Sequence, residues 1–442
     1  MTKSKGSSPI DPSIVMDASQ IGPSYANLEP GDPAPWFHQR STAATDHAFD
    51  MAAGRYIVLC FFGSTRNALG AAAIKCVIEN REYFDDIRIS FFGVSHDPCD
   101  EAEARVSQHL PGIRFFWDAD GLVSRLYGAL PNDVNADNTS QLAYRQYWLV
   151  LDPTLRVRHV IPFAPDGRDT AALFNHLAQL PPPSCFAGVE LQAPILYLPD
   201  VFGLDFCNQL LDRYRSNGGR EFGMMREIGG QTVEFKNYAF KRRKDYIVDD
   251  PGLIRQIDAL IQRRIAPEIL KNYCFKATRT ERYVVGCYSA EDGGHFRAHR
   301  DNTTLGTAHR RFAVSINLNS DFDGGDLSFP EYGPRKFKPP LGGAIVFPCS
   351  LLHAVSRVTL GSRYAFLPFL FDEEQSISWS RRRQVPGELN NPKAQLPRRR
   401  PNCCADSQCP PRVLCHEYRR SKRRCATVRE MKEGPSRSAI RC

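Results

Sequence analysis

Residues 294–301 read Gly-His-Phe-Arg-Ala-His-Arg-Asp, and this stretch decides how the second half of the chain is interpreted. In a β-strand, residues i and i+2 project from the same face, so His299 and Asp301 can converge on one point. Fe(II) accepts imidazole nitrogen and carboxylate oxygen together, and two histidines with one carboxylate leave coordination positions open. His295 could share a strand face with His299, but no carboxylate follows it at the same spacing, so we interpret it as a pocket or surface residue.

The third ligand has to come from a distant strand, and His353 is the candidate. It follows a glycine turn and an apolar strand at residues 342–348 (GGAIVFP), and Arg363 stands ten residues after it. A guanidinium on a neighbouring strand suits a carboxylate ligand, because its charge is fixed and its planar fork matches a carboxylate. Taken alone, His353 is more simply a buried histidine and Arg363 a surface charge. A metal site beside an anion site is predicted by four residues in this order: His299, Asp301, His353 and Arg363.

Short strands separated by Gly, Pro, Asp and Asn surround these residues. Many short strands at such spacing are typical of a β-sandwich or a jelly-roll barrel. Helical patterns precede the strands. The expected helices span residues 204–217 and 251–273, and the expected strands span residues 281–288, 312–318, 343–347, 354–358 and 363–371.

The order and spacing of these four residues resemble the site pattern of the iron- and 2-oxoglutarate-dependent dioxygenases of prolyl 4-hydroxylase type. The flanking segments 322–330 (FDGGDLSFP) and 342–348 agree with this resemblance, which covers roughly residues 195–375. The resemblance implies a double-stranded β-helix (jelly-roll) domain with flanking helices that holds iron at one end.

The same resemblance implies a role for each site residue. It places His299, Asp301 and His353 on Fe(II), and Arg363 on the co-substrate 2-oxoglutarate. Tyr288, on the strand before the metal-binding turn, matches the tyrosine that also reaches the co-substrate. The implied reaction is a hydroxylation that consumes O2 and releases succinate and CO2, with L-ascorbate keeping the iron reduced. The implied substrate is a prolyl or other protein residue, and free amino acids and small metabolites remain open.

The N-terminal half follows a different pattern. Residues 28–180 alternate strand-like and helix-like stretches, which predicts an α/β layer with a central sheet. The clearest strands are the apolar runs at residues 55–62 (RYIVLCFF) and 146–151 (QYWLVL). Residues 28–180 resemble the peroxiredoxin branch of the thioredoxin fold, on the basis of residues 31–37 (GDPAPWF), 56–62 (YIVLCFF) and 148–153 (WLVLDP).

Peroxidase chemistry needs a cysteine in the first turn of the helix after the first long strand, where the helix N-terminus lowers the thiol pKa. In the matching stretch, residues 63–70 (GSTRNALG), the place of that cysteine holds Gly70. Cys60 lies within the strand and Cys76 well inside the helix, so we interpret both as small buried hydrophobic residues. We therefore expect a peroxiredoxin-like domain without the peroxidatic thiol, which docks a partner or presents substrate to the oxygenase domain.

A chain of 442 residues is too long for one ordinary core, and these patterns divide it. We expect a flexible arm at residues 1–27, the peroxiredoxin-like domain at 28–180, a proline-rich linker at 181–194, the oxygenase domain at 195–375 and a tail at 376–442. The tail is basic. Residues 381–442 hold 17 Lys and Arg against five Asp and Glu, whereas the remainder holds 40 against 44, so no uniformly basic surface for nucleic acid is predicted.

The tail is expected to be a disordered, solvated extension, or even a reading-frame artefact. Nucleic-acid contact and zinc binding are less favoured alternatives. Six of the 14 cysteines lie in the tail without a CxxC pair, so the zinc spacing is weak. The zinc interpretation would use Cys403, Cys404, Cys409, Cys415 and His416.

Two further features concern location. The chain has no apolar run long enough for a transmembrane helix and no apolar core of a secretory signal near its start, so neither is expected. The eight cysteines outside the tail are scattered without a CxxC pair, which favours a reducing, cytoplasmic compartment.

Two alternatives to an oxygenase come from other classes. One is a non-catalytic scaffold, but a scaffold would not need His299, Asp301, His353 and Arg363 together, which argues against it. The other is a thiol peroxidase with an accessory β-domain, against which the glycine at position 70 argues.

Overall fold

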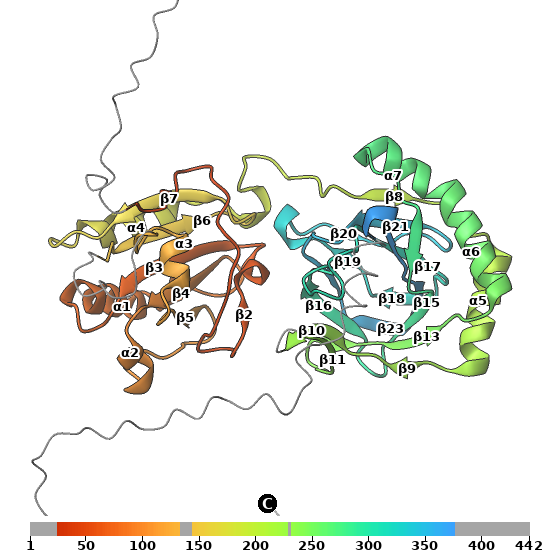
Figure 1. Cartoon of the computed structure of the whole chain (residues 1–442), viewed down its shortest axis with the longest axis horizontal. Helices are drawn as coiled ribbons and strands as arrows, with labels where there is room; N and C mark the ends of the chain where they lie inside the picture. Colours follow the sequence, from red (N-terminus) through yellow and green to blue (C-terminus); the bar gives the residue numbers. More distant parts are fainter. Residues whose placement is uncertain (1–23, 133–143, 229–230, 376–442) are drawn as a thin grey trace, which may run out of the picture. The chain divides into compact units, whose positions relative to one another are not determined.

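The computed structural model describes residues 24–132, 144–228 and 231–375, which are coloured in Figure 1. The basic tail and most of the expected arm lie outside these ranges, so the interpretations of the tail stay predictions. Within the described ranges, every helix is too short or too polar to span a lipid bilayer.

A five-stranded sheet occupies the N-terminal half, in the order β5-β4-β3-β6-β7. Strands β3, β4 and β5 run parallel, whereas β6 pairs antiparallel with β3, and β7 pairs antiparallel with β6. Along β3, Ile57 and Leu59 enter one hydrophobic core while Val58 and Phe62 enter the core on the other face. Burial on both faces explains why this strand reads as a continuous apolar run. The strands span β3 (Tyr56–Gly63), β4 (Ile89–Ser95), β5 (Ile113–Trp117), β6 (Tyr147–Leu151) and β7 (Val157–Pro162).

Helices α1 (Ala68–Glu79) and α4 (Arg168–Gln179) pack on this sheet, because both contribute to the core that contains Val58. Short helices α2 (Pro98–Ala102) and α3 (Leu122–Leu126) complete the predicted α/β layer. Helix α2 ends early because Ala104 adopts a left-handed conformation with φ of 50°, which no helix can continue through.

Two antiparallel sheets form the second half (Figure 1). The larger has the order β14-β24-β17-β23-β15-β13-β9, with β21 pairing to β17 and β8, and β18 pairing to β23. The smaller has the order β12-β16-β22-β19-β20. The strands of the larger sheet are β8 (Leu196–Leu198), β9 (Arg220–Glu221), β13 (Lys244–Ile247), β14 (Arg279–Glu281), β15 (Val284–Ser289), β17 (Phe312–Asn317), β18 (Phe322–Gly324), β21 (Ala344–Pro348), β23 (Val358–Phe366) and β24 (Phe369–Phe371). Those of the smaller sheet are β12 (Lys241–Arg242), β16 (His295–His299), β19 (Leu327–Ser328), β20 (Lys336–Phe337) and β22 (His353–Val355), and a separate hairpin joins β10 (Met224–Ile228) to β11 (Gln231–Phe235).

Strand alternation gives the larger sheet two different faces. On β17 and β21, Val314 and Val346 enter the core formed with helices α5 (Leu204–Asn217), α6 (Pro251–Arg264) and α7 (Ala266–Tyr273). The intervening Ala313 and Phe347 enter a second core that includes Phe296 of the smaller sheet. The helices therefore cover one face of the larger sheet, and the other face lines the interior.

Three expected elements differ from the structure. The strand expected at residues 354–358 is two strands, because β22 ends at Val355 and β23 begins at Val358. The strand expected at 363–371 is interrupted before β24 at Pro368, which has no backbone N–H to donate. The helix expected at 251–273 divides into α6 and α7, since Pro267 lies in the first turn of α7.

Candidate metal centre

The two histidines come from neighbouring strands. His299 is the last residue of β16 and His353 the first of β22, and the antiparallel register places them opposite each other. Asp301 does not reach the site by strand alternation, as the sequence had suggested, because β16 ends two residues before it. The loop that carries Asp301 is instead held by its own backbone, where the Asp301 N–H donates to the Cys349 carbonyl at 2.9 Å.

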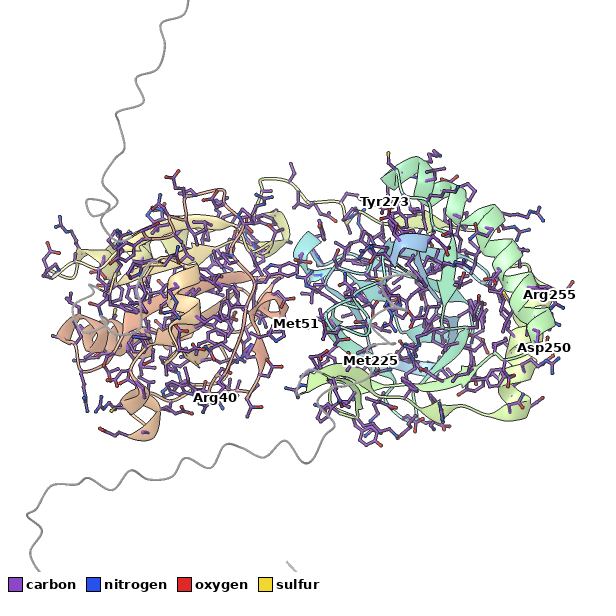
Figure 2. All side chains as sticks on the ribbon, viewed as in Figure 1. Arg40, Met51, Met225, Asp250, Arg255 and Tyr273 are labelled. Atoms are coloured by element: carbon purple, nitrogen blue, oxygen red, sulfur yellow. The ribbon has the colours of Figure 1, made fainter. Side chains whose placement is uncertain are left out.

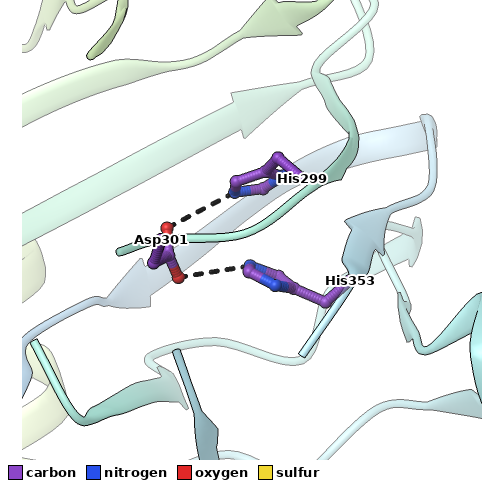
Figure 3. A group of neighbouring side chains, drawn as sticks. All are labelled: His299, Asp301 and His353. Carbon is purple, nitrogen blue, oxygen red and sulfur yellow. Dashed lines mark ion pairs between the residues drawn. The ribbon is translucent and has the colours of Figure 1, made fainter. Parts of the chain in front are cut away.

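Figure 3 shows both imidazole rings directed at the carboxylate of Asp301. His299 Nε2 lies 3.5 Å from Asp301 Oδ1, and His353 Nε2 lies 3.3 Å from Asp301 Oδ2. One donor atom from each side chain lies within 4.8 Å of the other two, and no other such group of three His, Cys, Asp or Glu residues occurs in the described part of the chain. The three predicted ligands are therefore brought together at one point.

Backbone carbonyls fix the protonation of both rings. His299 Nδ1 lies 2.8 Å from the Arg297 carbonyl, and His353 Nδ1 lies 3.0 Å from the Leu351 carbonyl. A carbonyl only accepts, so each Nδ1 carries a hydrogen and each Nε2 is the nitrogen that faces the centre. Burial lowers the pKa of His353 to about 4, which keeps this ring neutral at pH 7.

Asp301 supplies the negative charge. Its burial alone would raise the carboxyl pKa, but the two histidines and Arg310 lower it by more, and the net pKa lies well below the ordinary value. The centre is thus built from two imidazoles and one carboxylate.

A cavity of about 450 Å³ opens beside this centre and is also lined by Arg363 and Tyr288. These two residues are register partners on the adjacent strands β15 and β23. The Arg363 side chain is buried, with Nε donating to Asn317 Oδ1 at 3.0 Å and Nη2 to Ser315 Oγ at 2.7 Å. Among the described residues it forms no ion pair within 4 Å, so a buried cation faces the cavity with neutral partners only. Such a group is costly unless an anion joins it.

Tyr288 is held by a charged pair behind it. Arg243 Nη1 donates to the Tyr288 hydroxyl at 3.2 Å, and the same guanidinium binds both oxygens of Asp245 at 2.5 and 2.7 Å. Lys241 lines the cavity too, and its buried amino group donates to the Gly223 carbonyl at 2.7 Å. We did not predict these two basic residues, because a run of four cations at residues 241–244 is typical of a solvated surface.

His295 lies outside the group, in agreement with its interpretation. Its Nδ1 and Nε2 lie 2.8 Å and 3.2 Å from the backbone carbonyls of Gly293 and Ala239, and it does not line the cavity.

The peroxiredoxin-like half shows no thiol at the matching helix start in its described residues. A Cβ added to Gly70 would lie 2.3 Å from the Ser64 carbonyl oxygen, so the backbone leaves no space for a side chain there. Cys60 is fully buried, and burial raises its pKa well above the ordinary value. Cys76 is only partly buried, contrary to its interpretation as a buried residue, and desolvation also raises its pKa. Neither cysteine has the environment of a reactive thiolate.

Comparisons with known proteins agree with both halves. Residues 283–371 match the family described as the 2OG-Fe(II) oxygenase superfamily, and residues 30–160 match the AhpC/TSA family. A PKHD-type hydroxylase of a Synechococcus species is 25% identical over 149 residues, which is 32% of this chain and 64% of the relative. The PKHD-type hydroxylase PiuC of Pseudomonas aeruginosa is 36% identical over 91 residues, 19% of this chain and 39% of the relative.

The chain thus spans less than two thirds of these relatives' lengths. Among solved structures, a prolyl hydroxylase of Trichoplax adhaerens in complex with a peptide fragment of hypoxia inducible factor shares 18% identity, with 42% of this chain and 87% of that chain covered and a TM-score of 0.35. The family matches confirm both resemblances seen in the sequence: the chain contains a domain of the AhpC/TSA family followed by a domain of the 2OG-Fe(II) oxygenase superfamily.

Proposed function

We propose that the chain is an Fe(II)- and 2-oxoglutarate-dependent dioxygenase that hydroxylates its substrate, with O2 as second co-substrate and succinate and CO2 as co-products. One observation carries the proposal: two imidazole nitrogens and one carboxylate meet on the wall of a cavity that is also lined by a buried arginine, Arg363, which forms no ion pair with a described residue. The hydroxylase names of the relatives support it, and a prolyl or other protein residue is the substrate class that the relationship suggests.

The donor set fits Fe(II). Two neutral imidazoles and one carboxylate are the ligands of non-haem Fe(II) oxygenases, and they leave positions open for exchangeable ligands. His299, Asp301 and His353 would hold the metal, which when bound supplies the activation of O2, with ascorbate as the reductant that keeps it in the Fe(II) state. The carbonyls of Arg297 and Leu351 keep each Nε2 available for it.

The remaining residues position the co-substrate. Arg363 would bind the distal carboxylate of 2-oxoglutarate, because its guanidinium is fixed in orientation by Asn317 and Ser315 and has no anionic partner among the residues that the structure describes. Tyr288, held by Arg243, would donate its hydroxyl hydrogen to the same carboxylate. The cavity wall is largely apolar, which excludes water from the reacting groups.

Three finer statements belong to this proposal. The two antiparallel sheets would form a double-stranded β-helix, which the face-to-face core with Ala313, Phe347 and Phe296 supports. The boundary between domains would lie at residues 181–194, between the last helix of the α/β layer and β8. The location would be cytoplasmic, which the free cysteines of the described residues support.

The experiment uses purified protein with Fe(II), 2-oxoglutarate and ascorbate, and measures succinate released without added substrate. We expect succinate from the wild type and loss of it in His299→Ala, with iron binding lost in parallel. His295→Ala is the matched control, because this histidine lies on the same strand but outside the centre. A wild type that binds neither Fe(II) nor 2-oxoglutarate would refute the proposal and favour a scaffold.

A further inference from the structure

Arg300 stands between two of the predicted ligands, and its side chain is almost fully buried. Its Nε donates to Asp50 Oδ2 at 2.8 Å, and its Nη1 and Nη2 donate to the two oxygens of Glu331 at 3.1 and 3.0 Å. Its guanidinium also lies 4.5 Å from the ring centre of Trp36. Asp50 and Trp36 belong to the AhpC/TSA domain, and both domains lie within one compact unit.

The same network reaches the second histidine. Glu331 also accepts from the Leu352 N–H at 3.1 Å, next to His353, and Arg300 Nη1 donates to the Ser350 carbonyl. One buried arginine therefore connects the turn that carries His299 and Asp301 with the segment that carries His353. The Asp50 side chain, which supplies the carboxylate from the AhpC/TSA domain, is 6% exposed, so water does not replace it as the partner of Arg300.

Apolar packing follows the same route. Leu352 is fully buried in a hydrophobic core whose other members include Phe37, Phe49 and Phe116 of the AhpC/TSA domain. Ala298, the residue before His299, packs against the same core. The residue preceding each histidine ligand is thus part of the neighbouring domain's core.

The AhpC/TSA domain also lines the cavity. Residues between His38 and Met51, on strands β1 (His38–Gln39) and β2 (His47–Ala48) and the 3-10 turn η2 (Phe49–Ala52), share the cavity with the metal-binding group. At the rim, Asp46 lies 3.9 Å from Arg226 of the β10–β11 hairpin.

We propose that the AhpC/TSA domain forms part of the oxygenase site and is needed for its function. Asp50 is a positioning residue that holds the metal-binding turn through Arg300, and segment 38–51 is the wall that selects which substrate groups reach the metal. This inference rests on the proposed function and gives the domain a role that needs no thiol.

The chemistry of the wall specifies the group that it accepts. Its side chains are small or flexible and apolar at Ala43, Ala44, Ala48 and Met51, and Met225 of the facing hairpin lines the same cavity (Met51 and Met225 are labelled in Figure 2). Asp50 is occupied by Arg300. His38, Asp46 and His47 of the same segment also line the cavity, and His38 Nδ1 lies 2.9 Å from Asp46 Oδ1. The part of the substrate that contacts the alanine and methionine side chains is therefore uncharged and apolar, whether it is a protein side chain or a small molecule.

The position of the AhpC/TSA domain beside the metal-binding group is tested with the full-length chain and Mn(II) alone as the probe. The chain has four tryptophans, and in 5-fluorotryptophan-labelled protein the Trp36 resonance, assigned with Trp36→Phe, should broaden as Mn(II) binds, whereas Zn(II) leaves it sharp. Trp148, in the core on the opposite face of the β3 sheet, is the internal reference. Mn(II) binding without broadening of Trp36 beyond Trp148 would overturn the inference alone. Absence of Mn(II) binding would overturn the proposed function as well.

The positioning role is tested by substitution. Asp50→Asn keeps the shape and removes the charge, and we expect Mn(II) affinity to fall about tenfold, as for other residues that orient ligands indirectly. Asp50→Glu, which keeps the carboxylate, should recover most of this loss. Asp166→Asn, at an exposed ion pair of the same domain, is the control. Equal Mn(II) affinities in Asp50→Asn and Asp166→Asn, with both proteins folded by circular dichroism, would refute the positioning role.

Discussion

Replacing Arg363 with lysine tests the co-substrate site directly. The substitution keeps a positive charge in the same buried place but removes the planar fork. In the structure that fork is already oriented, with Nε on Asn317 at 3.0 Å and Nη2 on Ser315 at 2.7 Å. A lysine ammonium can satisfy one of these partners and approach an anion, but it cannot form two parallel hydrogen bonds to one carboxylate.

The expected loss follows from the lost bond. A hydrogen bond to a charged group contributes about 1.5–3 kcal/mol, so Arg363→Lys should weaken 2-oxoglutarate binding about 10- to 100-fold. Arg363→Met removes the charge as well and should weaken binding further. At a concentration 100 times the wild-type Kd, 2-oxoglutarate stabilises the wild type by about 2.7 kcal/mol, and a thirtyfold weaker variant by about 0.9 kcal/mol.

The measurement is anaerobic calorimetric titration of 2-oxoglutarate into Mn(II)-loaded protein, with unfolding followed in the presence and absence of the ligand. Arg279→Lys is the matched control, because Arg279 forms an exposed pair with Glu373 on the outer strand β14. Unchanged 2-oxoglutarate affinity in both Arg363 variants would show that the buried cation serves packing only, and the assignment of the anion site would be abandoned.

Three further outcomes are expected. Gly70→Cys should not create a peroxidase and should lower the stability by about 1–3 kcal/mol, because the new Cβ would meet the Ser64 carbonyl at 2.3 Å; a gain of peroxide turnover in a standard consumption assay would contradict this. Burial would raise the pKa of Asp86, but hydrogen bonds from Arg114 and Ser90 lower it to about 2, below the ordinary 3.8. The stability that this carboxylate contributes, about 2 kcal/mol at most, is therefore complete above pH 4 and is lost as the pH falls towards 2, and Asp86→Asn should flatten the stability profile in that window when unfolding is measured by urea titration. Leu352→Ala should cost about 2–5 kcal/mol in the same titration, and a cost below 1 kcal/mol would argue against its place in the AhpC/TSA core.

The sequence predicted the site better than it predicted the path of the chain through it. His353 could be assigned to a distant strand because an apolar run and a glycine turn precede it, and the register does place it opposite His299. Asp301 was assigned through strand alternation, yet it lies in a loop whose position depends on a hydrogen bond to Cys349. The spacing of two residues was informative although the geometry behind it was different.

Contacts between distant residues set the limit of such reasoning. The partners of Arg300 are 250 and 31 residues away in sequence, and nothing in the local pattern distinguishes this arginine from a solvated charge. Arg243 and Lys241 were missed for the same reason, since their burial depends on strands that pair only in the folded chain.

Strand alternation also explains why the two domains are coupled at the metal centre. When a histidine on β16 or β22 faces the cavity, the residue before it faces the opposite side, and on that side lies the core of the AhpC/TSA domain. A substitution at Ala298 or Leu352 therefore affects the packing of both domains. A fold that has no space for its peroxidatic cysteine can still be required in full, because its core supports the backbone from which His299 and His353 project.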